Sequence, residues 1–156
     1  MMTKRTKLLG AVAAPVIVLA AVVISLKLFT GGDDVVQARH NAIVADAQQL
    51  TVTVGDSLTF DRPTIIVEAG RPVVVTVRNL SATDHDFVIP SIPAQDVVVR
   101  FEGGHSHGDG TAIVGRPKKK GEVTVQFTPI EPGTYEFYCS ITGHKEAGMT
   151  GTVTVL

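Results

Sequence analysis

Apolar and polar residues alternate in short runs from about residue 50 to the C-terminus. This period-two pattern over four to eight residues is typical of β-strands with one buried face. The stretch 72–79 reads as one such strand, with Val73, Val75 and Val77 on one face and Val74, Thr76 and Arg78 on the other. The pattern predicts a β-rich domain in this part of the chain.

We predict seven or eight strands, most of them ended by turn-forming residues such as Gly, Pro or Asp. The runs are residues 50–54, 64–68, 72–79, 87–89, 97–101, 122–128, 133–139 and 150–156. No long helical periodicity and no internal repeat interrupts them. Short strands at this spacing indicate an all-β sandwich, and about 110 residues suffice for one hydrophobic core.

The N-terminal part has a different pattern. Residues 8–26 form an uncharged and almost entirely apolar run, and about 20 such residues cross a bilayer as a helix. Basic residues precede the run and two acidic residues follow it, which by the positive-inside rule keeps the N-terminus in the cytoplasm. We therefore predict a transmembrane anchor at residues 1–29 and a domain outside the cytoplasm, in the periplasm or the extracellular space.

A cleaved signal peptide is the alternative interpretation of this segment. Signal peptides usually have apolar cores of about 7–15 residues, and this run is longer. The small-residue stretch Val36-Gln37-Ala38 resembles a cleavage site but lies well past the apolar run. The anchor is favoured, and cleavage would make the domain a secreted one.

Residues 30–49 are expected to form a tether, since they combine two glycines with acidic and Ala-rich polar sequence, and the domain then covers residues 50–156. From Asp46 onward there are nine Lys or Arg and thirteen Asp or Glu, a balance of −4. Nucleic-acid binding relies on clustered Lys and Arg against phosphates, so we expect no nucleic-acid partner.

The chain has one cysteine, so no disulfide forms within it. In an exported protein such a residue is a free thiol, an intermolecular bridge or a metal ligand. Cys139, His144 and Met149 follow the pattern C-x4-H-x4-M on the loop between two predicted strands. Gly143 and Gly148 allow tight turns there, so this loop can present a thiolate, an imidazole and a thioether to one point.

These donors favour copper, because two His, one Cys and a weak axial Met form the ligand set of blue-copper electron-transfer sites. The second histidine must come from another loop. His85 is the best candidate, since it lies where one predicted strand ends and the next begins. Taken singly, each of these residues has a simpler explanation, such as a small core residue, core filler or a turn residue. Their joint order and spacing favour a metal site.

Two segments resemble the cupredoxin family. Residues 73–89 resemble its first-histidine region, and residues 127–155, containing EPGTYEFYCSITGHKEAGM, resemble its C-terminal ligand loop. The loop spacing is most similar to that of rusticyanin, sulfocyanin and auracyanin. The resemblance covers residues 50–156 and implies a Greek-key β-sandwich or barrel with one mononuclear type 1 copper.

The resemblance also implies the roles of individual residues. His85, Cys139 and His144 would be equatorial copper ligands, and Met149 would be the axial one. Further contacts would tune the potential: backbone N–H groups near Asp86 and Ile141 would bond the sulfur, and Asn79 would help tie the two loops together. One departure is Thr142, where many relatives have Pro, and we expect it to loosen the loop and shift the redox potential.

The resulting expectation is a one-electron carrier that cycles between Cu(II) and Cu(I). By resemblance, redox partner proteins would dock transiently near His144, among Ile141, Ala147 and Pro90. An enzyme is not expected, because four protein ligands leave no open position for a substrate. The chain is also too short for a multidomain copper oxidase.

Two alternatives stay open. In the first, the domain serves copper delivery, storage or homeostasis, and His105 and His107 assist it. Their H-S-H motif is either part of a solvated loop or an auxiliary copper or zinc site. A metal-free adhesion module is the third interpretation. Zinc rather than copper loading and the oligomeric state are also open.

Overall fold

The computed structural model describes residues 38, 41, 45–108 and 112–156. Residues 41–156 cluster into one compact unit. The predicted anchor at residues 1–29 and most of the predicted tether lie outside the described residues, so both stay predictions. Among the residues that are described, no helix has the length and apolar character needed to cross a membrane.

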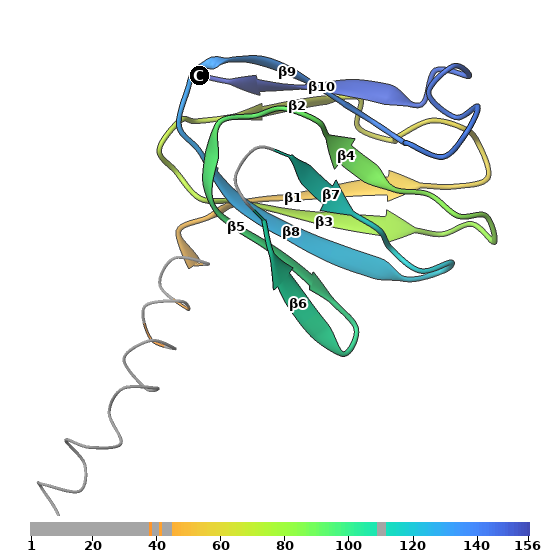
Figure 1. Ribbon diagram of the computed structural model, residues 1–156, viewed down its shortest axis with the longest axis horizontal. Coiled ribbons are helices and arrows are strands. Elements are labelled where there is room, and N and C mark those ends of the chain that lie inside the picture. The colour runs from red at the N-terminus through yellow and green to blue at the C-terminus, as the bar shows by residue number, and fades with distance from the viewer. Residues whose placement is uncertain (1–37, 39–40, 42–44, 109–111) are drawn as a thin grey trace, which may run out of the picture. The chain divides into compact units, whose positions relative to one another are not determined.

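Within the described residues, ten strands form two five-stranded sheets, with the orders β1-β3-β8-β5-β6 and β2-β10-β9-β4-β7. Figure 1 shows the two layers, with β2, β9 and β10 above and β1, β3 and β8 below. The strands are β1 (Gln48–Val54), β2 (Thr64–Val67), β3 (Val73–Asn79), β4 (Phe87–Ile89), β5 (Ala94–Phe101), β6 (Gly104–His107), β7 (Ile113–Gly115), β8 (Glu122–Pro129), β9 (Gly133–Tyr138) and β10 (Thr150–Val155). The prediction of an all-β sandwich is confirmed.

The alternating pattern accounts for the core between the sheets. In β3, Val73, Val75 and Val77 are buried, as predicted. The antiparallel register sets Val75 against Val125 of β8, which is also buried. Fully burying one such side chain contributes about 1.5–3 kcal/mol, and a run of them fixes the register because a one-residue slip would expose the whole set.

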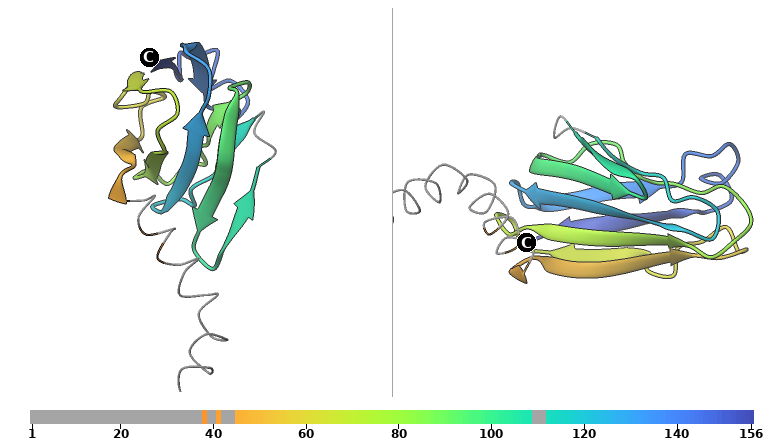
Figure 2. Two further views of the ribbon diagram at one scale, coloured as in Figure 1. Left: turned by 90° about the vertical axis from the view of Figure 1, so that its left-hand side faces the viewer. Right: turned by 90° about the horizontal axis from the view of Figure 1, so that it is seen from below.

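Two strands were missed by the sequence prediction, β6 and β7. The β6 strand has the sequence Gly-His-Ser-His, and all four residues are exposed, so it carries no period-two signal. It forms by antiparallel pairing with β5 and lies at the edge of its sheet, as the left view of Figure 2 shows. His105 and His107 therefore lie on a strand, whereas one interpretation of the sequence placed them in a solvated loop.

The β1 strand begins at Gln48, two residues before the predicted start. The backbone N–H of Gln48 donates to Pro72 O at 2.8 Å, and its side-chain oxygen accepts from the N–H of Glu68 at 2.9 Å. These long-range bonds extend the strand into polar sequence. The alternating pattern cannot reveal such an extension.

An aromatic cluster lies inside the sandwich. The rings of Phe87 and Phe137 have centroids 4.8 Å apart, and Phe60 packs against both at 6.1 Å and 5.1 Å. Gly151 on β10 leaves room for this cluster, because a Cβ there would collide with the ring of Phe137. Phe87 opens β4 and Phe137 is near the end of β9, so the cluster anchors both strands next to the candidate site.

Candidate metal centre

The predicted ligands are brought together by two neighbouring strands. β4 and β9 pair through Val88 and Tyr138. His85 lies two residues before β4, and Cys139 directly follows β9. Because the strands are antiparallel, the start of one meets the end of the other, and both ligand-bearing loops lie at the right-hand end of the sandwich in Figure 1.

Three of the four predicted ligands form a compact cluster. His85, Cys139 and His144 each offer one ligand atom, and these atoms all lie within 4.8 Å of one another. The Cys139 sulfur is 3.4 Å from His144 Nδ1, and the two imidazole centroids are 5.0 Å apart. His85 is 3% exposed, Cys139 is fully buried and His144 is partly buried, so the cluster combines a soft sulfur with two imidazoles at a largely buried position.

Met149, the fourth predicted ligand, closes the loop that carries Cys139 and His144. Its backbone N–H donates to His144 O at 3.0 Å, and its carbonyl accepts from the N–H of Cys139 at 3.1 Å. Its side chain is fully buried. These bonds hold the thioether residue beside both loop ligands, as the C-x4-H-x4-M spacing predicts.

The ligand loop depends on its glycines. The N–H of His144 donates to Ile141 O at 3.0 Å, and Gly143 has a φ of 82°. A positive φ at the third residue of such a turn defines type II, which requires glycine or asparagine there. Gly148, with a φ of 97°, supports the second turn before Met149. The predicted role of these two glycines is therefore confirmed.

His85 shows that the cluster fits a metal ion. Both of its ring nitrogens are buried without a hydrogen-bond partner, although buried polar atoms almost always have one. A metal bound to one nitrogen would remove part of this deficit. Burial, followed by the neighbouring His144, lowers the pKa of His85, so the imidazole stays neutral, which is the form that binds metals.

Cys139 fits the same conclusion. Burial raises the pKa of its thiol, while backbone N–H groups of Asp86 and Ile141 lower it in part. The N–H of Asp86 lies 3.4 Å from the sulfur. Both predicted contacts to the sulfur are thus present. They would stabilise the thiolate once a metal ion displaces its proton.

The link between the two loops comes from a side chain that the sequence analysis did not single out for this role. The Asp86 carboxylate, only 2% exposed, accepts from the backbone N–H and the hydroxyl of Ser140, both at 2.6 Å. Arg116 Nε approaches the same carboxylate at 3.7 Å. The sequence held one hint of this link, because Asp86 directly follows His85 and Ser140 directly follows Cys139.

Asn79 plays a more local part than predicted. Its side-chain amide donates to Thr83 O at 2.8 Å, and its side-chain oxygen accepts from the N–H and the hydroxyl of Ser81. In the described part of the chain these bonds shape the loop that ends at His85 and do not reach the C-terminal loop. The expectation that Asn79 ties the two loops together is therefore wrong, because its side chain is used up within residues 79–83.

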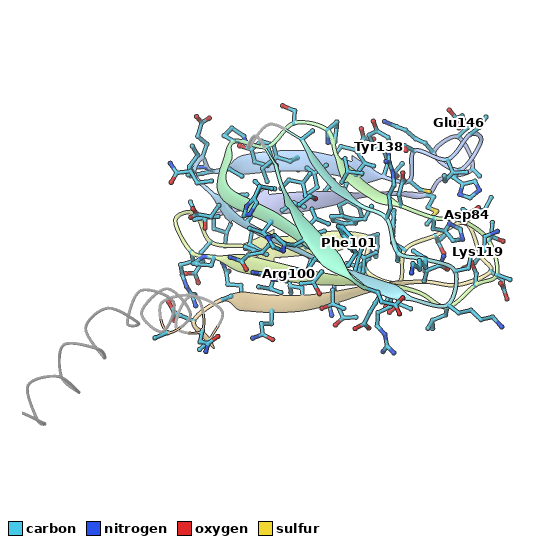
Figure 3. The ribbon with its side chains drawn as sticks, turned by 60° about the horizontal axis from the view of Figure 1, so that its bottom comes forward. Asp84, Arg100, Phe101, Lys119, Tyr138 and Glu146 are labelled. Carbon is cyan, nitrogen blue, oxygen red and sulfur yellow. The ribbon has the colours of Figure 1, made fainter. Side chains whose placement is uncertain are left out.

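The surface around His144 is mixed in character. Ile141, Ala147 and Pro90 are exposed, and His144 is partly buried. Figure 3 shows Asp84, Lys119 and Glu146 at the same end of the domain. Asp84 pairs with Lys119 at 3.3 Å, so part of this charge is neutralised.

The other two candidate ligands, His105 and His107, do not belong to this cluster. Both are exposed on β6, with ring centroids 5.2 Å apart.

Comparisons with known proteins agree with the donor set. A family model described as copper binding proteins of the plastocyanin/azurin family matches residues 38–156. The chain is 36% identical over 115 residues to the copper-resistant cuproprotein CopI of Rubrivivax gelatinosus, covering 71% of this chain and 68% of that protein. It is 31% identical over 99 residues to the CopI protein of Vibrio cholerae, covering 62% and 57%.

Solved structures support the fold. Reduced auracyanin from Roseiflexus castenholzii superposes with a TM-score of 0.51 at 24% identity, covering 70% of this chain and 98% of that one. Auracyanin A from Chloroflexus aurantiacus gives 0.52 at 20% identity, covering 70% and 99%. With the buried His-Cys-His cluster and the matching family, the cofactor is copper, and the chain belongs to the plastocyanin/azurin family of copper-binding proteins, the cupredoxins.

Proposed function

We propose that this chain is a one-electron carrier that works outside the cytoplasm while anchored to a membrane by residues 1–29. When bound, copper supplies the redox chemistry by alternating between Cu(II) and Cu(I). The observation that carries the proposal is the buried cluster of His85, Cys139 and His144 with its ligand atoms within 4.8 Å. A softer site of cysteine and methionine favours Cu(I), while two imidazoles accommodate Cu(II).

The frame around these residues suits electron transfer. Asp86 joins the two ligand loops through Ser140, and the loop from Cys139 to Met149 closes on itself through backbone bonds. Phe87 and Phe137 anchor the adjoining strands in the core. Ligands held in this way move little between oxidation states, so little reorganisation opposes the transfer.

An electron would leave through the exposed end of the domain. Ile141 is 36% exposed, and Ala147 and Pro90 lie at the surface. A small apolar patch next to the partly buried His144 would suit the limited, transient interfaces of redox partners. We expect no substrate turnover, because four protein ligands would fill the coordination sphere.

Copper resistance is the second candidate function. The two relatives described above are named copper-resistant cuproproteins, and this supports copper handling as much as electron transfer. In that case the domain would hold copper for delivery or storage, and release would matter more than the rate of electron exchange.

Voltammetry and copper-transfer kinetics on the full-length chain distinguish the two functions. An electron carrier should give a reversible Cu(II)/Cu(I) couple with fast self-exchange, and it should lose copper slowly to a Cu(I) chelator. Fast transfer of copper to the chelator, together with sluggish electron exchange, would support copper handling and reject the carrier. Cys139→Ser serves as the control, since it should abolish the couple.

The membrane anchor is tested separately by fractionation. We expect the full-length chain in the membrane fraction, with the domain accessible to protease from the side opposite the cytoplasm. Recovery of a shortened chain in the soluble exported fraction would instead establish a cleaved signal peptide.

A further inference from the structure

Outside the copper site, the domain presents a second close pair of imidazoles on the edge strand β6. His105 and His107 are two residues apart, so both side chains leave the same face of the strand. Both are exposed, and their ring centroids are 5.2 Å apart. The β5 register sets Arg100 opposite His105 and Val98 opposite His107.

The ring separation is compatible with a shared metal ion. An imidazole nitrogen binds an ion such as Zn²⁺ at about 2.0–2.1 Å, which puts the ring centre about 3.2 Å from the ion and two such centres about 4.5–5.3 Å apart at coordination angles of about 90–110°. The observed 5.2 Å falls in this range. The molecule itself offers a reference, because His85 and His144 in the copper site have centroids 5.0 Å apart.

The surroundings allow access. All four residues of β6 are exposed, and the strand lies at the sheet edge, so within the described residues no further strand covers the pair. The guanidinium of Arg100 is turned toward the neighbouring strand, where Nη1 donates to Gln126 Oε1 at 3.1 Å. The positive charge of Arg100 repels cations. A metal ion bound there would therefore be one with a strong affinity for imidazole nitrogen, and not one held mainly by electrostatic attraction.

We propose that His105 and His107 form a second metal site, which chelates one Cu(II) ion through two imidazole nitrogens and leaves its other positions to water. Nitrogen ligands bind Cu(II) more tightly than the other divalent first-row ions. The site has no sulfur ligand, so its copper would lack the thiolate absorption of the buried site. It is an exposed and exchangeable site, independent of whether the buried copper carries electrons.

The test uses the full-length chain with Cys139→Ser, which removes the thiolate of the buried site, and Cu(II) alone as the probe. We expect a nitrogen-coordinated Cu(II) signal in electron paramagnetic resonance. The affinity for Cu(II) should fall at least about tenfold after His105→Gln or His107→Gln, because linking a second ligand to the first can raise affinity by about 10²–10⁴. Binding that is unchanged in both single variants would overturn the proposal.

A matched control keeps the number of histidines and breaks only their geometry. The combination Ser106→His with His107→Ser places the two imidazoles on adjacent positions, and these point to opposite faces of the strand. The proposal expects the same loss of affinity as in His107→Gln. Full retention of binding in this swapped variant would mean that copper binds to separate histidines, and the chelate site would then be rejected.

Discussion

The two histidine pairs of this domain have nearly equal ring separations, 5.0 Å for His85 and His144 and 5.2 Å for His105 and His107, but different surroundings. The first pair lies at the buried junction of two loops beside a cysteine. The second lies on an exposed edge strand. Equal spacing therefore does not make equal sites, because burial and a soft third ligand determine which chemistry a pair can support.

The difference extends to the support beneath each pair. Below the buried pair, Phe87 and Phe137 pack at 4.8 Å, and the carboxylate of Asp86 joins the two loops. The exposed pair lies on β6, which in the described part of the chain pairs only with β5. Variants that remove the support or the sulfur should therefore affect the two pairs very unequally.

The largest effect is expected from Cys139→Ser. Removing the sulfur should abolish the intense visible band of the copper-loaded protein completely, because that band arises from thiolate-to-copper charge transfer. Visible absorption after addition of Cu(II) measures it, and His105→Gln should leave the band unchanged. A band that persists in Cys139→Ser would show that the buried cluster is not the blue site.

Asp86→Ala should have the next largest effect. It leaves the backbone N–H of Ser140 without its carboxylate partner, and loss of hydrogen bonds to a charged group costs about 1.5–3 kcal/mol. Denaturant unfolding of the metal-free chain measures this. Asp84→Ala is the matched control, because Asp84 is exposed and its carboxylate pairs with Lys119 at the surface, for which about 0–1 kcal/mol is expected. Equal losses in the two variants would remove Asp86 as the link between the loops.

Acidification should destabilise the metal-free chain through His85. Burial lowers the pKa of His85 below its ordinary value of 6.5, so between this value and its lower folded pKa the unfolded state binds more protons. Stability is therefore unaffected above about pH 7 and falls as the pH drops below about 6.5. Thermal unfolding at a series of pH values measures this decline.

The control for the pH profile is His85→Gln, which cannot take up the proton. Its own melting temperature should change less between pH 7 and pH 5 than that of the unaltered chain. His105→Gln, at an exposed position, should keep the original profile. A steep decline that persists in His85→Gln would assign the acid sensitivity to other groups.

A smaller gain is expected from Thr142→Pro. Thr142 occupies the second position of the type II turn closed by His144 and Ile141, where Pro is favoured. Pro restricts the unfolded chain and should raise the free energy of unfolding by about 0.4–1 kcal/mol. Denaturant unfolding measures it. A loss of stability would show that the Thr142 backbone does not have the conformation that Pro requires.

The smallest effect on the buried site is expected from joint replacement of the exposed pair, His105→Gln with His107→Gln. Surface changes of this kind usually alter stability by no more than about 0.5 kcal/mol. The visible band of the buried copper should stay unchanged in position and intensity. A shifted band would show that the β5–β6 hairpin communicates with the copper site, and the two pairs would then not be independent.

The sequence predicted much of the sandwich because its strands alternate strongly. The Val residues of β3 fall on the buried face as expected, and the eight predicted runs correspond to eight of the strands. β6 and β7 were missed: β6 has no apolar residue, and β7 is a short Ile-Val-Gly strand that forms by pairing with β4. β6 forms a hairpin with β5, the strand directly before it, and β7 pairs with the more distant β4, so neither strand shows in its own pattern of apolar residues.

The candidate site was also largely predictable, for a chemical reason. Cys139, His144 and Met149 lie on one short loop, so their spacing alone restricts them to one region. Asp86 was missed as the connection between loops, and Asn79 was wrongly assigned that role. Which polar side chain bridges two loops depends on how the loops meet, and the pairing of Val88 with Tyr138 sets that.

The sequence by itself determined the donor set, the β-sandwich class and the expectation of an exported, anchored chain, because these follow from residue types, order and local periodicity. The tertiary structure decided that His85 joins the loop ligands, that Asp86 locks them, and that His105 and His107 share one face of an edge strand. The first two features depend on contacts between residues far apart in the chain, which the packing of the fold creates, and the third depends on the pairing of β6 with β5.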